Sequence, residues 1–280
     1  MITTRAGRGR GRPRSTGAAR AGAPPVQVLD RGLHMLSVVA RYEHQTLTAL
    51  AATADMACST AYRMLETLRH HELVAFDTHT QTWSIGVEAF RVGQRYARHT
   101  HYLAAGRAVM RRLSEQTGET ANMAVIETGE LVYVAQIETS APIRAFIPTG
   151  TRGDPQASGI GKVLLAYMDD ALRAELTRVP PPAFTDHTYT DAAELALELD
   201  RVRARGWAVD DQERYVGMRC IAAPIFNEYA EPIAGLSISA PIDRLPVDHL
   251  AHKAVEVVAG AEEVTRRIGG RRPSPTRERP

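Results

Sequence analysis

The 280-residue sequence is poor in cysteine and in long apolar runs. Its two cysteines, Cys58 and Cys220, are too few for a disulfide framework or a four-thiolate metal site. No apolar stretch approaches the roughly 18 residues that a membrane span needs. The N-terminus lacks the apolar core of a secretory signal. These absences argue against a disulfide-stabilised secreted protein and against a membrane protein, and we expect a cytoplasmic protein.

Acidic residues are absent from residues 1–25, which instead hold six arginines: Arg5, Arg8, Arg10, Arg12, Arg14 and Arg20. The formal net charge of the whole chain is +2, so removing the six tail arginines leaves −4 for residues 26–280. The segment is also too poor in apolar residues to fold alone, and we expect a disordered tail. A basic tail on an acidic body predicts contact with a polyanion. The alternative is a solvated leader with no partner.

A nucleotide-binding loop is also missing, although "ASGIGKVLLA" (157–166) resembles one. A P-loop needs a glycine, four further residues and then Gly-Lys-Ser/Thr; here Gln156 stands in place of the first glycine, and Val163 follows Lys162. The dinucleotide fingerprint needs a third glycine in a βαβ unit. No histidine and cysteine set has metal-ligand spacing, so we expect no metal and no cofactor. A glycine turn at a helix start can still bind a carboxylate or phosphate through backbone N–H groups. Alternatively, the glycines only allow close packing.

From Val26 the sequence becomes helical in pattern. Residues 26–42 place six apolar residues on one helical stripe: Val28, Leu29, Leu33, Leu36, Val39 and Ala40. Thr48 is expected to cap a short second helix, and Ser59 a third. Asp55 between them tolerates a left-handed turn. The inward apolar residues of these two helices are Leu50, Ala51, Ala54, Ala61, Leu65 and Leu68.

The two helices and their turn predict a helix-turn-helix, whose second helix enters the DNA major groove. Four side chains at its start are expected to face outward and read DNA: Ser59, Thr60, Tyr62 and Arg63. Thr60 and Arg63 can bond phosphates or base edges. The following stretch, "LVAFDTHTQTWSIG", predicts two strands ending at Ile85 with a tip at residues 78–81, the wing of a winged helix. A helical pair used for protein contacts is the alternative.

The second half mixes helices with hairpins. Val87–His101 predicts a linker helix, and residues 104–115 another helix. Further predicted elements are a hairpin across residues 128–130, strands at 143–147, 206–210, 219–227 and 232–239, and helices after Gly159, at 191–205 and at 247–267. This order predicts an antiparallel sheet with helices packed on it, an α+β sensor-like domain.

Four side chains of this half could join the glycine turn in one pocket: Asp210, Cys220, Ser237 and Ser239. The two serines are two apart in a strand and therefore point to one face. They could hold the far end of an anion with a carbonyl or hydroxyl group. Asp210 must then accept from a donor or be neutral, because a bare carboxylate repels an anion. Alternatively, Cys220 is a small core residue and the serines bond the backbone.

Five segments together resemble the IclR (isocitrate lyase regulator) family of transcriptional regulators: "LDRGLHML", "TALAATADMACSTAYRMLETLRHHELV", "SGIGKVLLA", "GWAVDDQERYVGMRCIAAPIFN" and "PIAGLSIS". The likeness runs from about Val26 to Ile268. It implies an N-terminal winged helix-turn-helix, a GAF-like α/β effector domain, dimers or tetramers, operator DNA as a partner and a small organic acid as the effector. It also implies DNA reading by Ser59, Thr60, Tyr62 and Arg63.

The resemblance further implies an effector site of the glyoxylate- or pyruvate-binding kind, with backbone contacts from Gly159 and Ile160 and side chains Asp210, Cys220, Ser237 and Ser239. Two residues depart from the family pattern. Asp55 stands where the turn usually has glycine, and Cys58 where a basic or polar residue is common. In the tail, "RGRP" resembles an AT-hook core, whose Arg10 and Arg12 would read a narrow minor groove.

We therefore predict a ligand-responsive repressor of a small catabolic operon, not an enzyme. The expected boundaries are a tail (1–25), the winged helix (26–86), a linker helix (87–102), an effector and oligomerisation domain (103–268) and a basic disordered tail (269–280). One alternative is an enzyme with Cys220 as nucleophile, which needs a nearby base. A second is an architectural DNA-binding protein driven by the basic tail.

Overall fold

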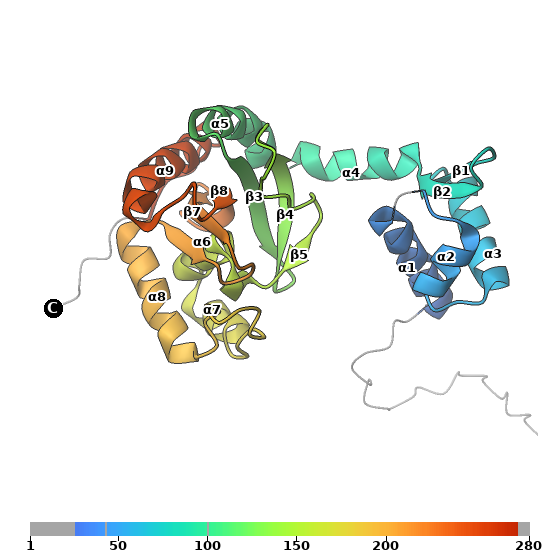
Figure 1. Cartoon of the computed structure of the whole chain (residues 1–280), viewed down its shortest axis with the longest axis horizontal. Helices are drawn as coiled ribbons and strands as arrows, with labels where there is room; N and C mark the ends of the chain where they lie inside the picture. Colours follow the sequence, from blue (N-terminus) through green and yellow to red (C-terminus); the bar gives the residue numbers. More distant parts are fainter. Residues whose placement is uncertain (1–25, 43, 100, 274–280) are drawn as a thin grey trace, which may run out of the picture. The chain divides into compact units, whose positions relative to one another are not determined.

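The computed structural model describes residues 26–42, 44–99 and 101–273 (Figure 1). Arg10 and Arg12 lie outside the described residues, as do the rest of the N-terminal tail and residues 274–280. The chain divides into two compact units between Arg95 and Tyr96, within helix α4 (Val87–His99). Each unit has its own core and is described by itself.

The first unit is a winged helix-turn-helix, as predicted. Its elements are α1 (Gln27–Arg41), α2 (Leu47–Thr53), α3 (Cys58–His70), β1 (Val74–Asp77) and β2 (Thr82–Ile85). The two strands pair antiparallel, with Val74 opposite Ile85. All six inward residues predicted for α2, its turn and α3 are buried, and Trp83 of the wing closes the same core.

The turn between α2 and α3 has the predicted backbone, but both predicted caps are wrong. Asp55 has φ +51°, the left-handed conformation that ends α2. The N-cap of α2 is Thr46 rather than Thr48, because its hydroxyl accepts a bond from the Ala49 N–H at 3.4 Å. The N-cap of α3 is Ala57 rather than Ser59, and it makes no side-chain bond. Both helices thus begin two residues earlier than local composition indicates.

The apolar stripe predicted for α1 is only partly buried. Val39 is buried, whereas Val28, Leu29 and Leu33 are each more than half exposed. Only the C-terminal half of α1 lies in the core, where Met35 and Val38 are buried. The exposed N-terminal residues line an open groove with α3. Helical periodicity identified the helix correctly but not the length of its buried face.

The second unit is built on a six-stranded antiparallel sheet of order β5-β4-β3-β8-β7-β6. The strands are β3 (Thr120–Glu127), β4 (Glu130–Ile137), β5 (Arg152–Gly153), β6 (Ala208–Asp211), β7 (Met218–Phe226) and β8 (Pro232–Pro241). Strands β3 and β4 form the predicted hairpin, whose turn residues Thr128 and Gly129 both have positive φ. The predicted α+β architecture is confirmed.

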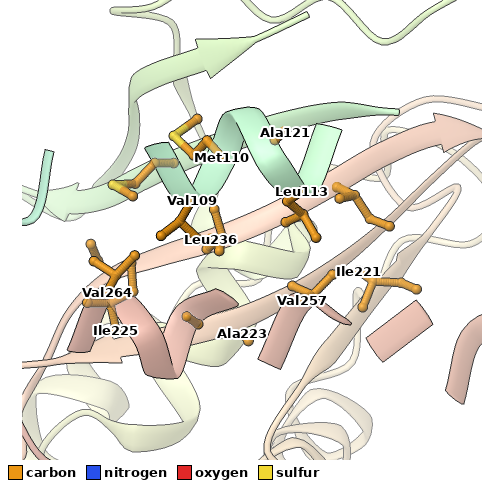
Figure 2. Packing of buried hydrophobic residues seen from close by; sticks show 14 of the residues in the cluster. Val109, Met110, Leu113, Ala121, Ile221, Ala223, Ile225, Leu236, Val257 and Val264 are labelled. Atoms are coloured by element: carbon orange, nitrogen blue, oxygen red, sulfur yellow. The ribbon is translucent and has the colours of Figure 1, made fainter. Parts of the chain in front are cut away.

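Helices cover both faces of this sheet. On one face lie α5 (His101–Thr117) and α9 (Leu250–Arg267), which contact each other and the strands. Figure 2 shows Val109, Met110 and Leu113 of α5 beside Leu236 of the sheet, with Val257 and Val264 of α9 close by. On the other face lie α6 (Gly159–Tyr167) and α8 (Ala192–Arg205), and the elements α7 (Asp170–Leu176), η1 (Pro155–Ala157) and η2 (Val247–His249) complete the unit.

The strand predicted at residues 143–147 is wrong, because this segment is a loop before the short β5. Ile143 and Phe146 are more than half exposed, while Ala145 is buried. Side chains rather than a strand ladder hold the backbone: the Thr120 hydroxyl donates to the Ala145 carbonyl (2.9 Å), and Arg244 donates to the Ile143 carbonyl (2.9 Å). Among the described residues, no helix has the length and apolar character needed to cross a membrane.

Candidate anion-binding site and nucleic-acid interface

A row of polar side chains crosses the sheet on the face covered by α6. The register places Asp210 opposite Cys220, Cys220 opposite Ser239, and Ser239 opposite Thr120. In the next row on the same face, Ser237 lies between Ala222 and Asn122. Directly paired residues of antiparallel strands point to one face. Side chains that are up to 119 positions apart in the sequence therefore lie on one face of the sheet. They include all four side chains that the sequence predicted for the effector pocket.

Hydrogen bonds tie this row together. The Cys220 thiol donates to the Ser239 hydroxyl oxygen (3.0 Å), and the Asn122 amide donates to the same oxygen (3.1 Å). Gln136 in turn donates to the Asn122 carbonyl oxygen (3.0 Å). Ser239 still has its own hydrogen to donate, and a ligand carboxylate would accept it. Sequence reasoning missed Asn122, although Thr120 and Asn122 repeat the two-residue spacing of the serines.

The start of α6 lies against the Asp210 end of this row. Its N-cap, Ser158, makes no side-chain cap bond, so the first N–H groups of the helix depend on other acceptors. A Cβ on Gly159 would lie 3.4 Å from the Asp210 backbone nitrogen and 3.7 Å from the Cys220 carbonyl oxygen. Gly159 and Ile160 are both buried. The helix start, the acid, the thiol and the serines thus share one region.

Gly161 shows why the glycine turn is needed for packing as well. A Cβ at this position would overlap the carbonyl oxygen of Pro155 in η1. Close packing, the alternative to anion binding, therefore explains Gly161. At Gly159 a Cβ would meet only ordinary contacts, so this residue is not required by packing alone.

Burial sets the charge state of the site. It raises the pKa of Asp210, against the opposing effect of Lys162 and of a backbone N–H bond from Glu213 (2.8 Å). Burial, reinforced by Asp210, also raises the pKa of the Cys220 thiol. The Cys220 residue is nevertheless partly exposed. A thiol that stays protonated is a weak nucleophile, contrary to what a Cys220-dependent enzyme requires.

A buried ion pair, which sequence reasoning missed, borders the site. Lys162 and Glu213 are almost completely buried, and the Lys162 ammonium bonds one oxygen of the Glu213 carboxylate. The ammonium also lies 5.0 Å from the centre of the Tyr189 ring. Burial raises the pKa of Glu213 to about 7. The available signal was a lysine inside the apolar helix "GIGKVLLAY", where a charge needs a partner.

The outer face of α3 presents the four predicted DNA-reading residues. Ser59, Tyr62 and Arg63 are exposed, and Thr60 is half-buried. Their helix packs inward through Ala61, Leu65 and Leu68. Arg63 makes no ion pair among the described residues, whereas Arg69 on the same helix pairs with Glu66 at 2.7 Å. Arg63 therefore offers its full charge to a phosphate or base edge.

Comparison with known proteins identifies the family. Residues 94–266 match the model of the bacterial transcriptional regulator IclR C-terminal domain, and residues 28–78 match that of the IclR helix-turn-helix domain. The chain belongs to the IclR family of transcriptional regulators. The resemblance inferred from the sequence is confirmed, and it places the chain among regulators rather than enzymes.

Curated relatives agree over nearly the whole chain. The HTH-type transcriptional regulator BhcR of Paracoccus denitrificans is 42% identical over 260 residues, covering 92% of each chain. The transcriptional repressor IclR of Escherichia coli is 36% identical over 251 residues, covering 88% of this chain and 92% of its own.

A solved structure has the same fold. An IclR homologue from Microbacterium hydrocarbonoxydans, crystallised with 4-hydroxybenzoate, superposes with a TM-score of 0.77 at 19% identity, covering 86% of this chain and 98% of its own. The IclR-family fold thus extends over both units.

Proposed function

We propose that this IclR-family regulator is a repressor of a small catabolic operon and that its effector is a small carboxylate of the glyoxylate or pyruvate kind. The effector would bind at the start of α6, against Gly159, Ile160, Asp210, Cys220, Ser237 and Ser239. The observation that carries the proposal is the meeting of two features on one face of the sheet: a helix start whose N-cap makes no side-chain bond, and the row of Asp210, Cys220 and Ser239.

The chemistry of these groups favours a carboxylate with a second polar group. N–H groups at a helix start and a serine O–H donate to anions. Asp210 at the same place repels a bare anion, unless Asp210 is protonated or accepts from a ligand hydroxyl. The Microbacterium homologue was crystallised with 4-hydroxybenzoate, which carries both a carboxylate and a hydroxyl. The small side chains of Cys220 and the serines favour a shorter acid here.

On the DNA side, Ser59, Thr60, Tyr62 and Arg63 would contact the operator through the major groove. Arg10 and Arg12 of the tail would add a minor-groove contact. A homodimer or tetramer would present paired DNA-binding units, and the exposed Val87 and Phe90 of α4 are available for contact between copies. The proposed units are a DNA-binding domain (26–86), a linker helix (87–102) and an effector-binding and oligomerisation domain (103–268).

The test is Ser239→Ala, which removes the donor that the carboxylate would use. We expect effector affinity to fall at least about tenfold, since a hydrogen bond to a charged group contributes about 1.5–3 kcal/mol. Calorimetric titration with glyoxylate and pyruvate measures the affinity, and fluorescence anisotropy of labelled operator DNA measures its release.

Ser114→Ala is the matched control, because Ser114 is a buried serine of the same unit on α5. It should bind both acids as the unmodified protein does. Unchanged effector affinity in Ser239→Ala, with operator binding intact, would show that the acid binds elsewhere.

A further inference from the structure

The pair of Lys162 and Glu213 is joined to the proposed effector site by short links. Glu213 follows Asp210 by three residues, and its N–H donates to the Asp210 carboxylate at 2.8 Å. Lys162 lies one turn beyond Gly159 in α6. The backbone of Glu213 is also fixed from the other side, because the Thr188 hydroxyl donates to its carbonyl at 2.7 Å. Glu213 therefore cannot move away from the site without breaking several bonds.

The two carboxylates of this region differ in their hydrogen bonds. Asp210 accepts backbone N–H bonds, which stabilise its ionised form. Glu213 accepts from Lys162 through one oxygen, whereas its other oxygen, Oε2, is buried and has no hydrogen-bond partner among the described residues. A buried carboxylate oxygen without a donor is costly as an anion. A proton on Oε2 would remove the cost of the buried negative charge, so Glu213 is the carboxylate better placed to bind one.

The charges around Glu213 do not balance once an anion arrives. Among the residues that the structure describes, four titratable groups face Glu213: Lys162 from α6, Asp210 from β6, Cys220 from β7 and Tyr189 from the segment before α8. With both carboxylates ionised and the thiol and phenol neutral, the cluster carries a net charge of −1 from one cation and two anions. A bound carboxylate would bring it to −2 in a buried region, where like charges repel strongly.

We propose that Glu213 is the proton-binding residue of the effector site, which takes up one proton from solvent when a carboxylate binds at the start of α6. The proton goes to Oε2, and no other bond is made or broken. Once Glu213 is neutral, the positive charge of Lys162 offsets the charge of the bound anion and no longer that of Glu213. This inference rests on the proposed function, since it concerns the same site. Burial supports it, because the pKa of Glu213 lies at about 7 before the ligand adds its charge.

The sign of the pH dependence follows. Below pH 7, Glu213 already carries the proton and binding takes up none. Above pH 7, binding of each acid must be accompanied by the uptake of a proton from solvent, so the effector affinity falls as pH rises, approaching tenfold per pH unit. A structural ion pair without this role would leave the affinity flat over the same range.

The experiment is calorimetric titration of the full-length protein with glyoxylate at pH 6.5, 7.5 and 8.5, which gives the dissociation constant at each pH. A further titration at pH 8 in two buffers of different ionisation enthalpy gives the number of protons taken up. We expect the dissociation constant to rise between pH 7.5 and 8.5 by about five- to tenfold, with proton uptake between 0.5 and 1 per site at pH 8. Glu213→Gln carries a neutral amide in place of the protonated acid. It should bind with an affinity independent of pH and take up no proton.

Glu198→Gln is the matched control, because Glu198 is also buried and ion-paired, with Arg205 at 2.7 Å. It should keep the pH dependence of the unmodified protein. Binding of glyoxylate with no proton uptake and a flat affinity would overturn the role of Glu213 while leaving the effector site intact. No binding of any small acid at any pH would instead overturn the proposed function itself. The titrations of the unmodified protein decide the matter even if Glu213→Gln folds poorly.

Discussion

Single residues of this protein carry different kinds of constraint even when they are close in sequence. Gly159, Gly161 and Lys162 lie within four positions, yet Gly161 is required by packing and Lys162 by its partner Glu213. Gly159 is required by neither, since a Cβ there would make only ordinary contacts. Under the proposed function, its small size instead leaves room for the effector beside the N–H groups of the first turn. Substitutions at these positions should therefore differ in what they damage.

Gly161→Ala should destabilise the second unit. The new Cβ would overlap the Pro155 carbonyl oxygen, and the backbone of η1 must move to relieve it. We expect the free energy of unfolding to fall by about 1–3 kcal/mol, the usual cost of overpacking a well-packed core. Urea denaturation followed by circular dichroism measures it. Gly153→Ala is the control, because nothing lies within 4 Å of its Cβ position, and a similar loss there would refute this explanation.

At the scale of elements, α3 and α6 present the residues proposed for binding in different ways. Helix α3 exposes polar side chains along its first two turns, so it can be inserted into a groove. Helix α6 is buried over almost its whole length and offers only the backbone of its first turn. The first arrangement suits a large, rigid partner such as a DNA duplex. The second suits a small ligand enclosed by the protein.

Arg63→Ala tests the role of α3. Arg63 is exposed and has no ion-pair partner among the described residues, so its loss should weaken specific operator binding by about 1–3 kcal/mol. Arg69→Ala on the same helix should have a smaller effect, because Glu66 already neutralises Arg69. Fluorescence anisotropy with operator and with random DNA separates the two arginines. Equal losses for both variants would indicate general electrostatic attraction, not sequence reading.

At the scale of the whole molecule, the two units have separate cores and divide within α4. The proposed effector and DNA sites lie in different units, so regulation through them requires a coupling free energy between the two units. Such coupling is reciprocal, because an effector that weakens DNA binding must be bound more weakly by the DNA complex. An unregulated pair of domains would show no such linkage.

Differential scanning calorimetry tests this division. Glyoxylate at 100 times its dissociation constant should stabilise the second unit by about 2.7 kcal/mol and raise its transition temperature. Operator DNA should raise the transition of the first unit. If the units are coupled, glyoxylate added to the DNA complex should lower the first transition towards that of the free protein. Independent shifts that simply add would argue against regulation through this site.

Much of the fold follows from local patterns in the sequence. Apolar spacing identified α3 and its buried residues, the turn at Asp55 was predicted from the backbone that aspartate tolerates, and residues 128–130 predicted the hairpin of β3 and β4. Such features depend on the period of a helix or strand and on the φ and ψ preferences of a few residues, which are local properties.

Other features depend on contacts between distant segments. Periodicity alone does not show that the N-terminal half of α1 is exposed, or that residues 143–147 lack a strand partner. The bond from Asn122 to Ser239 joins residues 117 positions apart, and that from Lys162 to Glu213 joins residues 51 apart. Strand register and helix packing bring these side chains together, so the tertiary structure alone decided which polar residues share the buried site. The sequence by itself determined which residues were available to it.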